Sequence, residues 1–147
     1  MDKAPAILIM IAAGGFIGLQ APINATLGRS IGTFPAASVS FAIGTIALVA
    51  ITLLIGGGFG RIGEAGNLAW YYLTGGILGA IYVTSALATV RVLGAGGVTA
   101  ATITGQLVAA VIVDRLGILG LEERPLSVTR ILGIALLAAG TFLVVRE

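Results

Sequence analysis

Apolar runs long enough to cross a lipid bilayer fill nearly all of this 147-residue chain. A tilted helix needs roughly 17–25 residues to cross about 30 Å of hydrocarbon. Five stretches meet or approach that length, at residues 4–27, 35–55, 68–90, 97–113 and 128–145. Membrane strands would instead alternate apolar and polar residues over about ten positions. The sequence therefore predicts an all-α, multi-pass membrane protein, with five transmembrane helices in a single transmembrane domain over residues 1–147.

The composition excludes several kinds of function. Charged residues make up 10% of the chain, whereas a soluble domain carries about 25%. Histidine and cysteine are both absent, which removes the usual zinc and haem ligands, thiol nucleophiles and imidazole bases. The net charge is only +2. We therefore expect no enzyme activity, no metal, no cofactor and no nucleic-acid partner, and we expect membrane lipid to surround the protein.

The connectors between the predicted spans are short, at residues 29–34, 56–67, 91–96 and 115–126. Five spans put the termini on opposite sides of the membrane. The N-terminal side then collects five basic residues and the other side collects three, namely Lys3, Arg61, Arg115, Arg124 and Arg130 against Arg29, Arg91 and Arg146. This small excess favours a cytoplasmic N-terminus. It is also compatible with insertion in both orientations, which would allow an antiparallel homodimer that mimics a covalent inverted repeat.

Two amides in the first span are candidate substrate ligands. Gln20 and Asn24 lie four residues apart, on one face of the helix. Pro22 lies between them, has no backbone N–H and leaves the carbonyl of Gly18 without its helical donor, so we expect a kink there. The alternative role for the amides is hydrogen bonding between helices, because Asn and Gln often join membrane helices in this way.

Further polar side chains lie in the other spans. Thr102 and Gln106 share a stripe of the fourth span, four residues apart. Serines and threonines in membrane helices often bond a carbonyl of their own helix, which is the alternative to a binding role. The predicted substrate-binding set is Gln20, Asn24, Thr102, Gln106, Ser40 and Tyr82.

Glycine is frequent, with 23 residues. Gly14 and Gly18 lie four apart in the first span, and Gly75 and Gly79 lie four apart in the third. Small residues at this spacing let membrane helices approach closely. We therefore expect these four glycines to serve helix packing and, together with the kink at Pro22, to ease sliding of the first helix.

Two charged residues flank the last connector. Asp114 ends the fourth predicted span, and Arg130 lies just inside the fifth. A carboxylate at that depth can reach water or pair with a basic residue. The pair is either an interfacial ion pair or a site of proton or cation coupling. Ser127, which follows Pro125, is the predicted N-cap of the fifth helix.

Five segments of the chain resemble, in order, the five helices of a bacterial membrane family of unknown function within the drug/metabolite transporter superfamily. The segments are QAPINATLG (20–28), SFAIGT (40–45), WYYLTGGILGAIYV (70–83), GQL (105–107) and PLSVTRILG (125–133). The resemblance implies half of an inverted-repeat transporter in the bacterial plasma (inner) membrane. Such a unit works as a pair, either with a second copy of itself or with the product of a neighbouring gene. We expect an antiparallel homodimer that transports a small molecule by alternating access.

The related small multidrug exporters use a glutamate in the first helix, where this sequence offers Gln20 and Asn24. The resemblance together with these amides therefore implies a neutral or zwitterionic metabolite as substrate. Three alternatives remain open from the sequence. The protein could be a passive channel, a lipid-handling protein, or a membrane subunit that transports nothing without a partner.

The five-span count can be tested by labelling, since the chain contains no native cysteine. We expect cysteines placed at Gly60 and Glu122 to react with a membrane-impermeant maleimide from the same side in any one orientation, because two spans separate these positions. Reaction from opposite sides would contradict the five-span arrangement.

Overall fold

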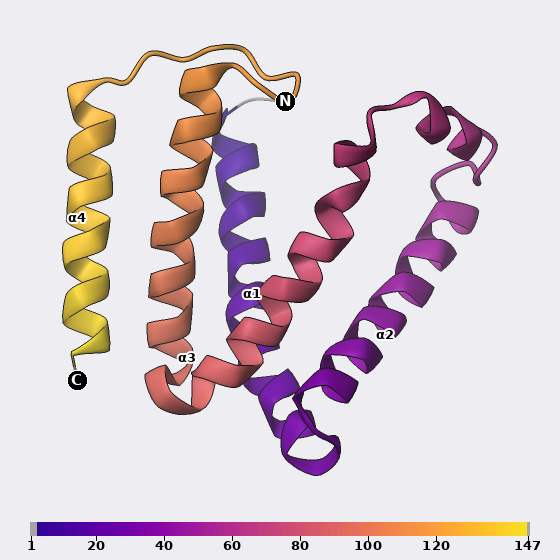
Figure 1. Ribbon diagram of the computed structural model, residues 1–147, viewed down its shortest axis with the longest axis horizontal. Helices are drawn as coiled ribbons and strands as arrows, with labels where there is room; N and C mark the ends of the chain where they lie inside the picture. Colours follow the sequence, from indigo (N-terminus) through magenta and orange to yellow (C-terminus); the bar gives the residue numbers. More distant parts are fainter. Residues whose placement is uncertain (1–2, 147) are drawn as a thin grey trace. The chain divides into compact units, whose positions relative to one another are not determined.

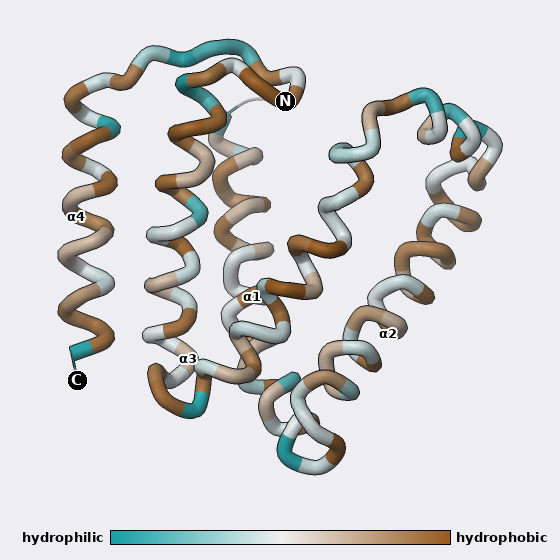
Figure 2. The backbone as a smooth tube through the Cα atoms, viewed as in Figure 1, coloured by the Kyte–Doolittle hydropathy of each residue, from teal (hydrophilic) through white to brown (hydrophobic). Residues whose placement is uncertain are grey.

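The computed structural model describes residues 3–146, and within that range the chain forms helices and connectors without any strand. Apolar residues run along the helices, whereas hydrophilic residues gather in the connectors (Figure 2). In chain order the elements are α1 (Lys3–Ile31), α2 (Thr33–Leu54), the 3₁₀ helices η1 (Ile62–Asn67) and η2 (Trp70–Thr74), α3 (Gly75–Leu116) and α4 (Val128–Val145) (Figure 1). The predicted all-α membrane fold is confirmed.

The third and fourth predicted spans both lie in α3, which has 42 residues. Gly94 inside α3 has φ 67° and ψ 169°, which is far from helical geometry. Glycine adopts a positive φ at little cost because it has no Cβ. The element therefore consists of two helical segments, residues 75–93 and 95–116, and each is close to the length that a membrane span needs. Counted as whole helices, four elements of the described chain are long and apolar enough to cross a membrane, and the break in α3 makes a fifth possible.

The predicted connector at residues 29–34 is wrong in extent. α1 continues to Ile31 and α2 begins at Thr33, so that Gly32 alone lies between the two helices. Gly32 has φ 94°; its N–H donates to the carbonyl of Gly28 at 3.0 Å, and its own carbonyl accepts from Ala36 at 3.1 Å. α1 and α2 therefore both extend beyond the apolar runs predicted from the sequence. Gly32 makes this possible because its positive φ reverses the chain within a single residue.

The described chain divides into two compact units. The central unit is Leu19–Arg91, and the terminal unit comprises the described residues up to Gly18 and from Val92 onward. α1 passes between them at Gly18, whose carbonyl loses its helical donor because Pro22 has no N–H. α3 passes between them at Val92, two residues before Gly94. One connection therefore lies four residues before a proline without a backbone N–H, and the other lies two residues before a glycine with non-helical geometry.

Small residues hold the central unit together. The buried residues of α1 are Ala21, Asn24, Ala25 and Gly28, which share one helical face. Ala36, Ala37, Val83 and Leu87 form a buried cluster from α2 and α3, with Leu27 and Tyr82 packed against it. A Cβ at Gly28 would lie 3.7 Å from the Cβ of Ala36 and 3.8 Å from Leu87. The three helices therefore approach most closely where side chains are smallest, as membrane helix packing favours.

Hydroxyl groups join two helices of the terminal unit. The Oγ1 atoms of Thr104 in α3 and Thr141 in α4 lie 2.6 Å apart, and the Thr141 hydroxyl donates to the carbonyl of Ala100 at 3.0 Å. α4 begins after Ser127, whose side chain accepts from the N–H of Arg130 at 3.2 Å. The predicted N-cap is therefore confirmed, and α4 spans the residues that the sequence predicts.

Close packing at Gly28 leads to a stability prediction. Gly28→Leu places a branched side chain against Ala36 and Leu87, and overpacking of this kind costs about 1–3 kcal/mol. We expect a Tm several degrees lower in detergent, followed by circular dichroism. Gly76→Leu is the control, because a Cβ at Gly76 meets no heavy atom within 4 Å. Equal stability of both variants and the wild-type protein would contradict the packing described here.

Candidate solute-binding pocket

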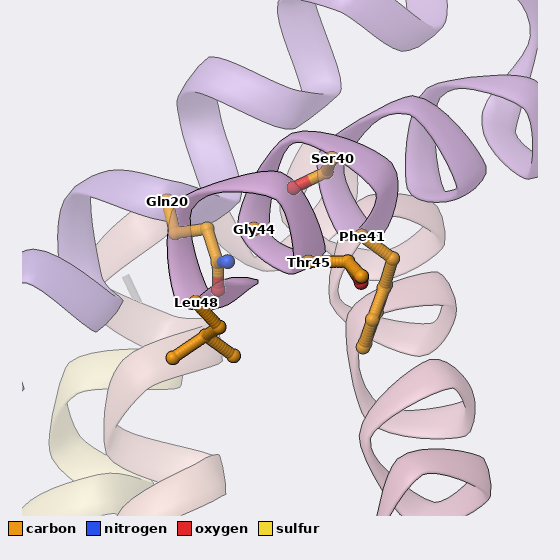
Figure 3. Close-up of a pocket in the computed structure, with 6 residues that line it drawn as sticks. All are labelled: Gln20, Ser40, Phe41, Gly44, Thr45 and Leu48. Carbon is orange, nitrogen blue, oxygen red and sulfur yellow. The ribbon is translucent and has the colours of Figure 1, made fainter. Parts of the chain in front are cut away.

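A pocket of about 200 Å³ lies between α1 and α2 in the central unit (Figure 3). α1 contributes Gln20, whose amide group lies beside the α2 side chains in Figure 3. The residues that α2 contributes are Ser40, Phe41, Gly44, Thr45 and Leu48. Apart from Ser40, these α2 positions repeat at intervals of three and four, which places them on one helical face.

The pocket has a mixed lining, more apolar than polar, and carries no charged side chain among its lining residues. Gln20 supplies an amide, and Ser40 and Thr45 supply hydroxyls, while Phe41 and Leu48 supply hydrocarbon. At Gly44 a Cβ would meet no heavy atom within 4 Å, so that this glycine leaves open space. Burying a charge without a counter-charge is costly. The lining therefore suits an uncharged polar group more than an ion.

Asn24 does not line the pocket itself but hydrogen-bonds to Ser40, which does. The Asn24 side chain is buried, with 6% of its surface exposed, and its Nδ2 donates to Oγ of Ser40 at 3.1 Å. This hydrogen bond joins α1 to α2, which is the interhelical role that the sequence left open for this amide. Because Ser40 also lines the pocket, Asn24 lies immediately behind the pocket wall rather than in it.

The third span supports the pocket without lining it. A Cβ at Gly79 would lie 3.4 Å from the ring of Phe41, so Gly79 leaves room for that ring against α3. Gly75 has no heavy atom within 4 Å of its Cβ position. Tyr82 is half-buried and packs against the apolar cluster of the central unit, and it is not one of the pocket residues.

Thr102 and Gln106 belong to the terminal unit and do not line this pocket. Thr102 is half-buried and Gln106 is exposed, and neither side chain has a hydrogen-bond partner within residues 3–146. Of the two remaining glycines, a Cβ at Gly18 would lie 3.8 Å from the hydroxyl of Thr99, and a Cβ at Gly14 would meet no heavy atom within 4 Å. An unpaired amide in a buried site costs roughly 1–3 kcal/mol, so Gln106 needs a partner from water, a ligand or another chain.

Asp114 and Arg130 form an ion pair in the terminal unit. Nη2 of Arg130 lies 3.1 Å from Oδ2 of Asp114, and both side chains are about one-third exposed. The backbone carbonyl of Asp114 accepts from the N–H of Arg124 at 2.7 Å, which ties the last connector to the end of α3. The two charges compensate each other where α3 ends and α4 begins.

Besides Gly44, three residues of the pocket were not in the predicted substrate-binding set: Phe41, Thr45 and Leu48. Their spacing of four and three along α2 is the signal that could have found them, because it places them on one helical face with Gly44. Phe41 and Leu48 are apolar in an apolar span, and nothing in composition separates them from residues that face lipid.

Apolar helices of membrane-spanning length, with a pocket that has no charged side chain in its lining, define a multi-pass α-helical membrane protein. A family model described as "Putative inner membrane exporter, YdcZ" matches residues 5–143, which reach from α1 into α4, and the chain belongs to this family. The match confirms the resemblance to a drug/metabolite-transporter-type family and places the protein in the inner membrane. No curated protein and no solved structure matches the sequence.

Proposed function

We propose that this protein is a secondary transporter that moves a small neutral or zwitterionic metabolite across the inner membrane. Its membership of an exporter family supports transport as the general activity. The observation that carries the proposal is the pocket between α1 and α2, where an amide and two hydroxyls lie within helices long enough to span a bilayer. Hydrogen-bonding groups without charge orient a neutral polar solute and exclude an isolated ion.

The pocket argues against simple exchange of a cationic drug for a proton. Such exchange needs an acid that the drug and the proton can occupy in turn, and no carboxylate lines this pocket. Asp114 is the candidate for coupling to protons, and its ion pair with Arg130 at 3.1 Å would have to open when it binds one. The alternative for this pair is a purely interfacial role.

We also propose that two copies form an antiparallel homodimer that works by alternating access. Gln106 supports this proposal, because its exposed amide lies in a membrane span without a partner in the described chain. A second copy or the substrate would supply the missing hydrogen bonds. The weak charge bias of five basic residues against three supports insertion in both orientations.

The transport proposal predicts saturable uptake of a subset of radiolabelled sugars, polyols and amino acids into proteoliposomes. Gln20→Ala and Gln106→Ala should each lower kcat/KM by up to about tenfold, because each removes an amide available to the solute or to a second copy, for a hydrogen bond worth roughly 0.5–1.5 kcal/mol. Ser38→Ala is the matched control, since its hydroxyl donates to the carbonyl of Phe34 in its own helix at 3.0 Å. Variants that unfold at lower temperature yet transport normally per folded dimer would assign the amides to helix packing instead.

The alternatives give different results in the same vesicles. Single-channel currents would indicate a passive channel, and movement of labelled lipid between leaflets would indicate a lipid-handling protein. Uptake that requires a second co-reconstituted protein would indicate a subunit of a heteromer. Each of these results, without saturable solute uptake by the protein alone, contradicts the proposal.

The antiparallel dimer predicts a response to added charge. Ser30→Lys together with Val92→Lys raises the basic count on the smaller side from three to five and removes the bias. We expect the two orientations to become equally populated, as measured by maleimide labelling of a cysteine at Gly60 from each side. A single orientation in the native protein, together with crosslinks of a parallel pair, would contradict the antiparallel dimer.

A further inference from the structure

Ser40 uses its hydroxyl differently from the hydroxyls that bond the backbone of their own helix. Six side chains donate to the carbonyl four residues earlier in their own helix, at 2.8–3.0 Å, and they are Thr26, Ser38, Thr52, Thr89, Thr99 and Thr104. Ser40 instead accepts a hydrogen bond from Asn24 at 3.1 Å. Within residues 3–146 its own hydroxyl hydrogen has no acceptor. Ser40 therefore does not follow the pattern in which serines and threonines of membrane helices bond their own backbone, and it shares this with Thr45 and Thr102.

The hydrogen bond from Asn24 determines the direction of the Ser40 hydroxyl. A hydroxyl has one hydrogen. When its oxygen accepts a hydrogen bond from an amide N–H, its own hydrogen points away from that amide, toward a different acceptor. Asn24 is buried beside Ala21 and Ala25, so its amide is held by packing and not free to turn away. Ser40 lines the pocket, and its hydrogen is therefore available to whatever enters.

We infer that Asn24 is a positioning residue that makes Ser40 a hydrogen-bond donor to the solute, and that the pocket selects uncharged solutes bearing an acceptor oxygen such as a carbonyl. The inference rests on the proposed function and narrows its substrate class from neutral or zwitterionic to neutral. Gln20 and Thr45 add an amide and a hydroxyl that have no partner elsewhere in the described chain. Phe41 and Leu48 provide apolar contact for the rest of the solute.

A pair of ring compounds can test this selectivity on the full-length protein in lipid nanodiscs. Cyclohexanone carries an acceptor oxygen, whereas methylenecyclohexane has a CH₂ group in its place and nearly the same shape. Saturation-transfer NMR would measure the Kd of each, with empty nanodiscs subtracted to remove partitioning into lipid. Cyclohexylammonium, which is charged, is the third probe. We expect the wild-type protein to prefer the ketone to both others.

The variants separate a donor at Ser40 from a general effect on folding. Ser40→Ala should weaken ketone binding about three- to tenfold, as the loss of one hydrogen bond predicts, and leave the alkene within about twofold. Ser40→Thr should restore the preference because it keeps the hydroxyl. Ser38→Ala should have no effect, since that hydroxyl bonds Phe34. Equal ketone binding by the wild-type protein and Ser40→Ala, or tighter binding of the ammonium ion, would overturn the inference.

A double-variant cycle tests the positioning role of Asn24. In Asn24→Leu we expect Ser40 to turn to the carbonyl of Ala36, as Ser38 turns to Phe34, so ketone preference should fall as in Ser40→Ala. Adding Ser40→Ala to Asn24→Leu should cause no further loss. Additive losses would show that Asn24 acts independently of Ser40 and would overturn its positioning role. These binding results need no transport, so they can fail while saturable uptake stands, and the converse also holds.

Discussion

The hydrocarbon core of a bilayer offers no hydrogen bonds, and every polar group of this chain that enters it must find a partner inside the protein. Backbone groups find theirs in the helices. Six hydroxyls bond a carbonyl one turn earlier, as Ser38 does to Phe34, and Thr141 of α4 donates to the carbonyl of Ala100 in α3. Asn24 finds Ser40. Among the polar side chains of the described residues that remain without a partner, Gln20 and Thr45 lie together in one pocket, where a solute can be held.

The same constraint makes small residues structurally important. Without water to drive apolar surfaces together, helices associate through close contact, and Gly28 permits that contact with Ala36 and Leu87. Asn24 lies on the same buried face of α1 as Gly28, one turn earlier. The close packing therefore brings the Asn24 amide within hydrogen-bonding distance of Ser40 and fixes it there. The contact that packs α1 against α2 therefore also sets up the hydrogen bond on which the proposed role of the pocket depends.

Much of the fold follows from the sequence because long apolar runs leave few structures available. α4 begins and ends where the sequence predicts, since Ser127 caps it and a polar connector precedes it. The predicted helix boundaries were wrong where a helix continues beyond its apolar run. At Gly32, a single glycine joins α1 to α2 in place of the predicted six-residue connector. The 3₁₀ helix at Trp70–Thr74, within the predicted third span, was not expected either, because 3₁₀ and α geometry share nearly the same sequence preferences.

The pocket was predictable only in part. Gln20 and Ser40 stand out as polar residues in apolar spans, and both line it. Asn24 stands out for the same reason, but it lies behind the pocket wall. The spacing of residues along a helix does not show whether a face lines a pocket or packs against another helix. Tyr82 is polar at its tip, yet it packs against the apolar cluster. The apolar wall formed by Phe41 and Leu48 depends on how α1 and α2 meet, which no local pattern encodes.

The central claim is that the pocket between α1 and α2 holds the solute and opens to each side of the membrane in turn. The most direct test is labelling of a single cysteine at Thr45, in a chain without native cysteine, by an impermeant maleimide applied from one side only. Alternating access predicts that labelling from one side goes to completion and slows when transported solute is present. If each pocket opened to one side only, about half of the molecules in an antiparallel population would be labelled. That result, or no labelling at all, would contradict the account.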